Sequence, residues 1–318
     1  MMVNEEHVAK DEEAGILKML TIEPGTDLLA AEVRRMAIQT LEGGGLIYLP
    51  KGGFELSERE RVLISDTANI LTRVPDVENG KPTIIFDPES GHIKKYHYAQ
   101  IQGKMMRAQI KDTARPDLEA IMARYGQWTE SIIAQLFPSY QQALDRKRVT
   151  YRPFPRNSTQ ALHIDSSYGY PTQGRSMLRV FTNINPVNRL RIWQLGEPFE
   201  PFVQRFLPDV KVSGPSWLSI LLARIGLIDG VKTKYDQYIA ALRALGMRDK
   251  EYQVSAPREL MEFPAGSSWI AITDLVLHGA ISGQHSLDQT FYLPVEAMND
   301  PSRSPLRILE RLIGEALV

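Results

Sequence analysis

The sequence predicts an α+β fold whose core is a double-stranded β-helix, a cupin-like jelly roll, with helical N-terminal support and a helical insert between two strand blocks. Extended segments cluster in two blocks, at 149–185 and 261–294. Turns separate the segments within each block, whereas a doubly wound parallel sheet would need regular crossover helices. Helical periodicity dominates before the first block and between the two blocks.

The length and composition fit one large domain. The chain has 318 residues, of which 43% are hydrophobic, which is enough for a substantial core. We expect residues 1–148 to be mainly helical support carrying the first strands, and 149–294 to hold the core strands with the helical insert at 199–247. A C-terminal helix is expected within 302–318.

The first third of the chain alternates helices and short strands. Apolar residues recur every three or four positions over 27–42, and three glycines then end this helix. A buried strand is expected at 46–49, and Ser57 and Glu60 form a capping box that opens the next helix. Residues 83–86 have strand character and precede a turn.

The remaining elements follow from the same patterns. Pro116 opens a helical region that reaches about residue 146, with a break at 137–138. The expected strands and helices after it are 150–154, 161–165 and 176–185 (extended), 199–247 (helical), 261–264, 267–273, 275–278 and 290–294 (extended), and 305–318 (helical).

The absence of cysteine excludes several kinds of chemistry. With no Cys in the chain, disulfides, thiolate catalysis and iron–sulfur clusters are excluded, so a metal site must use His, Asp or Glu. Dinucleotide, P-loop, serine-hydrolase and zincin motifs are also absent. The polar N-terminus and the short apolar stretch 217–228 lead us to expect a cytoplasmic protein without a membrane span.

The near-neutral net charge of −1 conceals a basic block. Residues 145–191 contain nine basic residues, eight of them Arg, and only two acidic ones, so this window carries +7 against −8 elsewhere. Arg suits bidentate binding of carboxylate or phosphate, although a solvated basic face is the simpler interpretation. Without an aromatic platform motif, the block does not predict nucleic-acid binding.

Three residues form a candidate metal site. His163 and Asp165 are two residues apart in an extended segment, so both side chains leave the same face. His278 follows an apolar strand and supplies a third ligand. Two His and one carboxylate form the facial triad of non-haem Fe(II) oxygenases, which leaves positions open for a co-substrate and O₂. The alternative is that both histidines are core residues.

Arg179 lies in the middle of an apolar strand, where an unpaired guanidinium would be costly. The distal carboxylate of 2-oxoglutarate would supply a partner, while the keto acid end of the same molecule chelates the iron. The alternative is a salt bridge on a sheet surface.

Several motifs resemble the Kdo 3-hydroxylase family, where Kdo is 3-deoxy-D-manno-oct-2-ulosonic acid. The resemblance extends over about 151–294, and the Arg-x-Phe-Thr-Asn-x-Asn-Pro block is its most specific part. The motifs are His163-Ile164-Asp165, Pro171-Thr172-Gln173-Gly174-Arg175, Leu178 to Pro186, Arg191-Ile192-Trp193, Gly196 to Phe199, Leu277-His278-Gly279-Ala280, Ser282-Gly283-Gln284 and Gln289-Thr290-Phe291.

The resemblance implies an Fe(II)- and 2-oxoglutarate-dependent dioxygenase that uses O₂ to hydroxylate Kdo at carbon 3 on a lipid A precursor, giving Ko. His163, Asp165 and His278 would be the catalytic metal ligands. Many members of the wider superfamily place the 2-oxoglutarate Arg after the distal His, but 280–294 contains no Arg or Lys. Arg179 is then the expected anchor, with neutral hydrogen bonds from Asn183 or Gln289.

The anionic substrate implied by the resemblance gives the basic block a role. The four residues expected to bind the sugar acid at the mouth of the site are Arg152, Arg156, Arg175 and Arg191. A lipid substrate also implies peripheral contact with the cytoplasmic face of the inner membrane. The apolar stripes of 217–228 and the C-terminal helix are candidates for it, although packing in the core or at a dimer face is the favoured interpretation of both. Two alternatives remain open: a hydroxylase of another small anion, and a non-catalytic jelly roll that binds sugars or anions.

Overall fold

The computed structural model describes residues 18–318 except 52, 74–82, 98–99, 102–103, 106–108, 156–159, 167–170 and 213–230. For residues 73, 95–97, 100–101, 104–105 and 109 it gives only the backbone. Arg156 and the apolar stretch 217–228 lie outside the described residues. No described helix is both long and apolar enough to cross a membrane.

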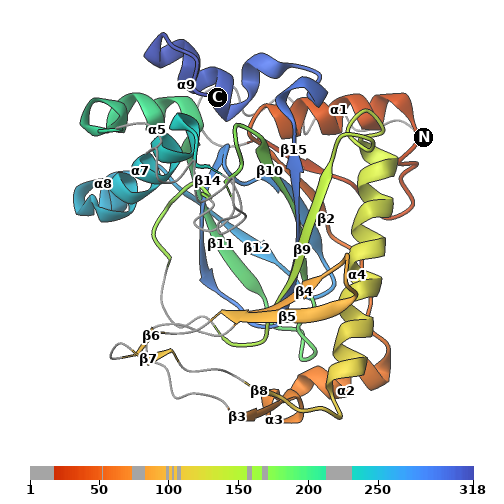
Figure 1. The fold of residues 1–318 in the computed structure, drawn as a ribbon. Helices are drawn as coiled ribbons and strands as arrows, with labels where there is room; N and C mark the ends of the chain where they lie inside the picture. Colours follow the sequence, from red (N-terminus) through yellow and green to blue (C-terminus); the bar gives the residue numbers. More distant parts are fainter. Residues whose placement is uncertain are drawn as a thin grey trace.

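An eight-stranded sheet forms the larger wall of the fold (Figure 1). Its strands, in spatial order, are β1 (Met19–Thr21), β2 (Leu46–Leu49), β13 (Ser268–Ile272), β10 (Ser176–Asn183), β15 (Ser286–Leu293), β9 (Asp145–Arg152), β4 (Thr83–Asp87) and β5 (His92–His97). All pairs are antiparallel except β1 with β2. Strands from the middle of the chain (β9 and β10) therefore alternate with strands from its last fifth (β13 and β15) at the centre of the sheet.

A three-stranded sheet forms the facing wall, in the order β12 (Glu259–Phe263), β11 (Arg191–Pro198) and β14 (Val276–Ser282). His163 extends this sheet, because its backbone exchanges two hydrogen bonds with that of His278. Two short ladders complete the described strands: β3 (Leu71–Arg73) with β8 (Gln109–Ile110), and β6 (Gln100–Ile101) with β7 (Lys104–Met105).

Helices cover the outside of the larger sheet and one end of the molecule (Figure 1). The described helices are α1 (Ala31–Glu42), α2 (Glu58–Ser65), α3 (Thr67–Ile70), α4 (Arg115–Leu136), α5 (Phe199–Phe206), α7 (Lys234–Arg248), α8 (Lys250–Ser255) and α9 (Pro305–Ile313), with short 3₁₀ turns η2 (Leu207–Asp209), η3 (Val295–Ala297) and η4 (Pro301–Arg303). Apolar residues of α1 and α4 pack on Ile47, Leu178 and Val180 of the sheet, which buries its outer face.

The space between the two sheets has an aromatic half and a polar half. Phe181, Trp193, Phe263 and Trp269 form a buried cluster in which Phe263 and Trp269 stack at 3.9 Å. The rest of the space holds His163 and the charged side chains described below. The close-packed aromatic cluster sets the distance between the two sheets, and the polar half contains the candidate site.

The two-sheet core with helical support agrees with the predicted fold class. The strand at 46–49 and the capping box at Ser57 are confirmed, and the first helix begins at Ala31 rather than at 27. Strand β11 was not expected, and β9 begins at Asp145, inside the predicted helical region. Pairing with β14 and β15 stabilises these two polar strands, and such partners cannot be seen in a local pattern.

Candidate metal centre

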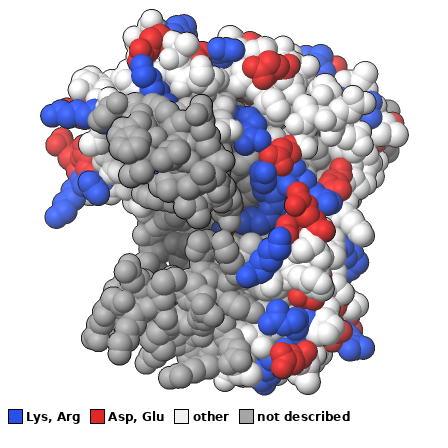
Figure 2. All heavy atoms as spheres, in the orientation of Figure 1, with Lys and Arg blue, Asp and Glu red and all other residues white. Residues whose placement is uncertain are grey.

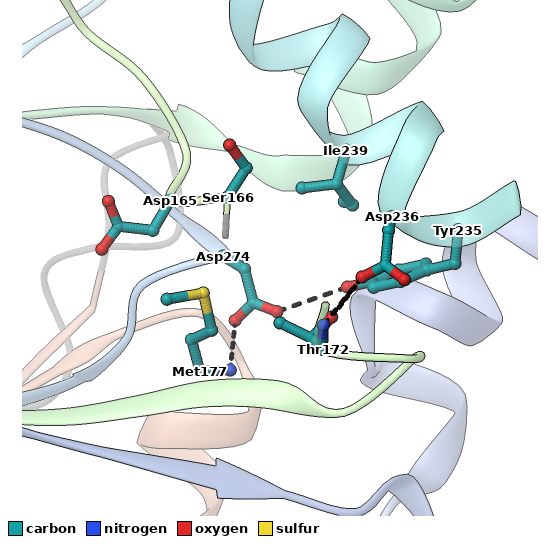
Figure 3. A pocket seen from close by; sticks show the side chains of 8 residues that line it. All are labelled: Asp165, Ser166, Thr172, Met177, Tyr235, Asp236, Ile239 and Asp274. Carbon is teal, nitrogen blue, oxygen red and sulfur yellow. Dashed lines mark hydrogen bonds between the residues drawn. The ribbon is translucent and has the colours of Figure 1, made fainter. Parts of the chain in front are cut away.

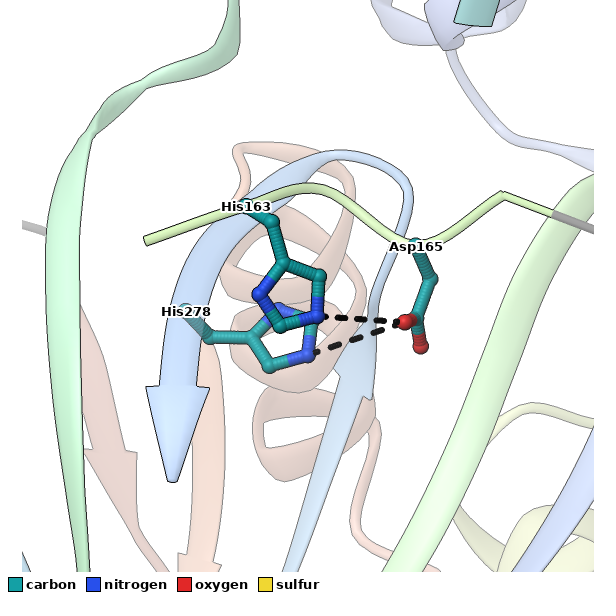
Figure 4. Close-up of side chains that lie close together, drawn as sticks. All are labelled: His163, Asp165 and His278. Carbon is teal, nitrogen blue, oxygen red and sulfur yellow. Dashed lines mark ion pairs between the residues drawn. The ribbon is translucent and has the colours of Figure 1, made fainter. Parts of the chain in front are cut away.

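His163, Asp165 and His278 come together between the two sheets, and one ligand atom from each lies within 4.8 Å of the others. The segment that contains His163 runs beside β14, and the β-bridge between His163 and His278 places their imidazoles side by side, with ring centroids 4.7 Å apart. Oδ1 of Asp165 lies 3.7 Å from Nε2 of His163 and 4.0 Å from Nε2 of His278 (Figure 4). The three donors converge on one point.

Backbone carbonyls select the histidine tautomer that a metal needs. Nδ1 of His163 lies 2.8 Å from the carbonyl oxygen of Ala161, and Nδ1 of His278 lies 2.9 Å from that of Val276. Each Nδ1–H therefore donates to a carbonyl, which leaves the lone pair on Nε2 directed at the cluster.

The charge states suit a dication. Burial lowers the pKa of His278 to about 4, so its imidazole is neutral at pH 7. Burial acts to raise the pKa of Asp165, but Arg179 and the neighbouring histidines hold that pKa well below its usual range. The site therefore offers two imidazole nitrogens and one carboxylate, a hard donor set that fits Fe(II) and leaves a face for other ligands.

Gly279 allows the His163 segment to lie close to β14. A Cβ at this position would lie 2.5 Å from the carbonyl oxygen of Gln160 and 3.0 Å from that of Ala161. We expect Gly279→Ala to displace His163 and to weaken metal binding by about 10- to 100-fold, the usual cost of disturbing a ligand's support. Titration with Mn(II) measures this. Gly126→Ala on α4 is the control, because its Cβ would make only ordinary contacts, and equal losses in both variants would contradict the expectation.

Arg179 lies on the inner face of β10 and contacts two carboxylates. Its Nη1 donates to Oδ2 of Asp165 at 2.6 Å, and its Nη2 donates to Oδ1 of Asp288 on β15. The guanidinium also lies over the ring of Phe181, with Cζ 4.7 Å from the centroid. Nε has no hydrogen-bond partner among the described residues. Two of five N–H groups are thus used, and the others remain available to a further anion.

Two more arginines line this wall. Arg148 and Arg152 share one face of β9, and Nε of Arg152 donates to Oδ2 of Asp288 at 3.0 Å. Burial lowers the pKa of Arg148, and the charge of Arg179 lowers it further, while Asp288 acts in the opposite direction. In Figure 2, basic side chains gather in a hollow near the positions of β9 and β10 in Figure 1. Positive charge is therefore concentrated beside the metal ligands.

Two residues predicted to contact 2-oxoglutarate, Asn183 and Gln289, make hydrogen bonds to the backbone instead. The side-chain amide of Asn183 donates to the carbonyls of Arg189 and Phe263 and accepts from the backbone N–H of Asn185. It therefore stabilises the turn that follows β10. Gln289 faces away from the site, donates to the carbonyl of Lys147 and lies against α4. Strand alternation places Asp288 rather than Gln289 on the inner face, and these contacts give no support to a co-substrate role for either residue.

The predicted substrate residues occupy different places. Arg152 is on the inner wall, and Arg175 pairs with Asp145 at 2.8 Å and lies over the ring of Tyr292. Arg191 is buried against Gly283. On β11 it lies four residues before Leu195, which pairs with His278. That separation is about 13 Å of strand.

Sequence reasoning missed three residues near the centre. Asp288 was overlooked although the alternation of β15 places it with Thr290, and Arg148 was counted in the basic block without a role. Trp193 appeared only within a motif, yet its ring stacks on that of His278 with centroids 5.0 Å apart. Only the pairing of β11 with β14 reveals this contact.

A small pocket lies behind Asp165 and contains a second buried acid, Asp274 (Figure 3). Asp274 accepts hydrogen bonds from the amide N–H of Met177 at 2.8 Å and from the hydroxyl of Tyr235 at 3.3 Å. Burial raises the pKa of Asp274 to about 7, and the charge of Asp165 acts in the same direction. Asp274 is therefore partly protonated near neutral pH.

This raised pKa predicts a pH-dependent stability. Because the folded protein holds this proton more tightly than the unfolded chain, the free energy of unfolding falls as pH rises from about 4 to about 7. The whole shift corresponds to about 4 kcal/mol at 1.36 kcal/mol per pKa unit, of which about 3 kcal/mol is lost between pH 5 and pH 8, and we expect Asp274→Asn to abolish this loss. Urea unfolding in chelator-containing buffer at pH 5 and pH 8 measures it. Parallel slopes for the wild type and the variant would contradict the expectation.

The comparisons with known proteins agree with this site. The family model described as 3-deoxy-D-manno-oct-2-ulosonic acid (Kdo) hydroxylase matches residues 25–316. The chain is 32% identical to a solved structure of the Kdo hydroxylase KdoO, a non-haem Fe(II) alphaketoglutarate-dependent dioxygenase, in complex with alphaketoglutarate and Fe(III), with a TM-score of 0.78 over 94% of this chain and 97% of that one. A KdoO structure with cobalt(II) has a TM-score of 0.79 at the same identity and coverage.

A third KdoO structure, in complex with succinate and Fe(III), matches with a TM-score of 0.78, again at 32% identity and the same coverage. No curated protein sequence matches the chain. The family model covers nearly the whole chain, and the ligand cluster, the tautomers and the charge states fit the metal chemistry of these relatives. The chain therefore belongs to the Kdo hydroxylase family of non-haem Fe(II)/2-oxoglutarate-dependent dioxygenases.

Proposed function

We propose that this protein hydroxylates Kdo at carbon 3, giving Ko, on a lipid A precursor, with Fe(II), 2-oxoglutarate and O₂. The match to the Kdo hydroxylase family over residues 25–316 is the observation that carries the proposal. The basic wall beside the metal ligands supports an acidic substrate.

His163, Asp165 and His278 would hold the iron, which with 2-oxoglutarate supplies the oxygen-activating chemistry. Arg179 binds the distal carboxylate of 2-oxoglutarate with the N–H groups that Asp165 and Asp288 leave available. Trp193 and Phe181 line the floor of the site and keep water from the reacting atoms.

The charge of the wall favours an anionic substrate. Arg148, Arg152 and Arg179 face the two carboxylates of Asp165 and Asp288. Fe(II) adds two positive charges and 2-oxoglutarate two negative ones, so one positive charge remains for the substrate. A sugar acid with a single carboxylate would neutralise it.

Arg152 and Arg175 are the proposed substrate contacts. Arg152 is one-third exposed at the inner wall, and Arg175 lies at the end of the same wall beside Tyr292. We leave Arg191 out of the substrate contacts because it is buried and distant along β11. A lipid-borne substrate also requires the enzyme to meet a membrane surface at the open side of the site.

Identification of the product tests the proposal. The purified enzyme with Fe(II), 2-oxoglutarate and O₂ is given a Kdo-containing lipid A precursor in detergent micelles, free Kdo, or lipid A without Kdo. We expect a product heavier by one oxygen, located at carbon 3, only with the Kdo-containing lipid, together with stoichiometric succinate. Turnover of free small acids but not of the lipid would replace the proposed substrate with another small anion.

A further inference from the structure

The two oxygens of Asp165 have separate partners. Oδ1 faces Nε2 of both His163 and His278 (Figure 4), whereas Oδ2 accepts from Nη1 of Arg179 at 2.6 Å. A metal bound by the two imidazoles would therefore meet only Oδ1. Such one-oxygen binding keeps the carboxylate from occupying a second coordination position.

Arg179 does not favour this arrangement by itself. A guanidinium is a planar fork that matches both oxygens of a carboxylate, and paired contacts of this kind are its strongest. If both Nη groups of Arg179 donated to Asp165, the guanidinium would occupy Oδ1 as well as Oδ2. The metal would then compete with the guanidinium for Oδ1.

Asp288 prevents that pairing because it accepts a hydrogen bond from the second Nη group of Arg179. Its Oδ1 accepts from Nη2 of Arg179, and its Oδ2 accepts from Nε of Arg152 at 3.0 Å. Burial acts to raise the pKa of Asp288, but the surrounding arginines, Arg179 first, lower it, so the side chain is ionised. Asp288 is fully buried on β15, the strand paired with β10, and its position is fixed by the sheet.

We propose that Asp288 is a positioning residue of the metal centre, which divides the Arg179 guanidinium between two carboxylates and so keeps Oδ1 of Asp165 available to the metal. The inference concerns the iron site of the family and does not depend on which substrate is hydroxylated. It predicts opposite effects of Asp288→Asn on the two ligands of the site. Metal binding weakens, and 2-oxoglutarate binding is retained or strengthened because a neighbouring negative charge is lost.

The test measures binding without turnover. Mn(II) or Co(II) is titrated anaerobically against the fluorescence of the tryptophans, of which Trp193 stacks on the ligand His278. We expect the metal dissociation constant to rise about 10- to 100-fold in Asp288→Asn. The affinity for 2-oxoglutarate, read at saturating Fe(II) from the visible charge-transfer band, is expected to stay within threefold or to increase.

A second variant guards against loss of folding, because Asp288→Asn leaves Arg179 and the half-buried Arg152 without their shared acid. Arg152→Gln/Asp288→Asn removes one cation with the anion, yet still leaves Arg179 to Asp165 alone. We expect the same loss of metal affinity in this double variant, and none in Arg152→Gln, where Asp288 still holds Arg179.

Glu130→Gln, which breaks an Arg146 pair on the outside of the sheet, is the matched control and should change neither affinity. Unchanged metal affinity in both Asp288 variants would overturn the proposal. Parallel loss of both affinities together with the melting temperature would also overturn it, since that result indicates a purely structural role. Failure of the Kdo assay alone would leave these binding results unaffected.

Discussion

His163→Ala is expected to weaken Fe(II) binding by at least about 100-fold, since the loss of an outer partner of a ligand alone costs about 10- to 100-fold. Turnover, measured as succinate release, should fall by on the order of 1,000-fold, or about 4 kcal/mol in the activation free energy. The reason is geometric. The backbone bridge to His278 and the hydrogen bond from Nδ1 to Ala161 already orient Nε2, so no other described side chain offers an equivalent donor.

The control for this prediction is His92→Ala, which removes an exposed imidazole on β5 far from the cluster in the sheet order. It should retain wild-type metal affinity and turnover. A His163→Ala protein that keeps its activity, or that loses only stability, would show that the imidazole is a core residue and would refute its role as a ligand. Far-UV circular dichroism of both variants separates misfolding from loss of the metal.

The metal ligands could be predicted from the sequence because their geometry is local. Two side chains separated by one residue in an extended segment share a face, whichever strand lies beside them. His278 could be added because it follows an apolar run that predicts a strand, and few other histidines compete with it. The basic block was equally visible, and the structure places three of its arginines beside the ligands.

Residues whose role depends on pairing could not be found in this way. Gln289 and Asp288 are neighbours, and which of them faces inward depends on the register of β15 against β10, where Phe181 lies opposite Asp288. Asn183 shares the inner face with Arg179 but lies beyond the aromatic cluster. The alternation of side chains along a strand predicts which face of the sheet a residue occupies. How far that residue lies from the metal ligands depends on which strands, from remote parts of the chain, pair with its own strand.

Arg179→Gln should have two large effects that can be separated. The variant leaves Asp165 and Asp288 as buried carboxylates without their shared cation, and breaking a buried pair in this way costs about 3–5 kcal/mol of stability. It also removes the proposed anchor of 2-oxoglutarate, so the dissociation constant of the co-substrate should rise by about 100-fold, or about 2.7 kcal/mol. Urea unfolding measures the first effect, and the anaerobic charge-transfer titration measures the second.

A double variant distinguishes anchoring from stability. Arg179→Gln/Asp288→Asn removes the second carboxylate, whose remaining partner Arg152 is one-third exposed and can be solvated. Most of the lost unfolding free energy should therefore return, whereas the affinity for 2-oxoglutarate should not, because neither substitution restores a guanidinium. If co-substrate affinity recovers together with stability, Arg179 is only a structural ion-pair partner. The anchor would then have to be another arginine of the wall, and the half-buried Arg148, which lies within charge range of Tyr292 and Asp288, is the one the geometry favours.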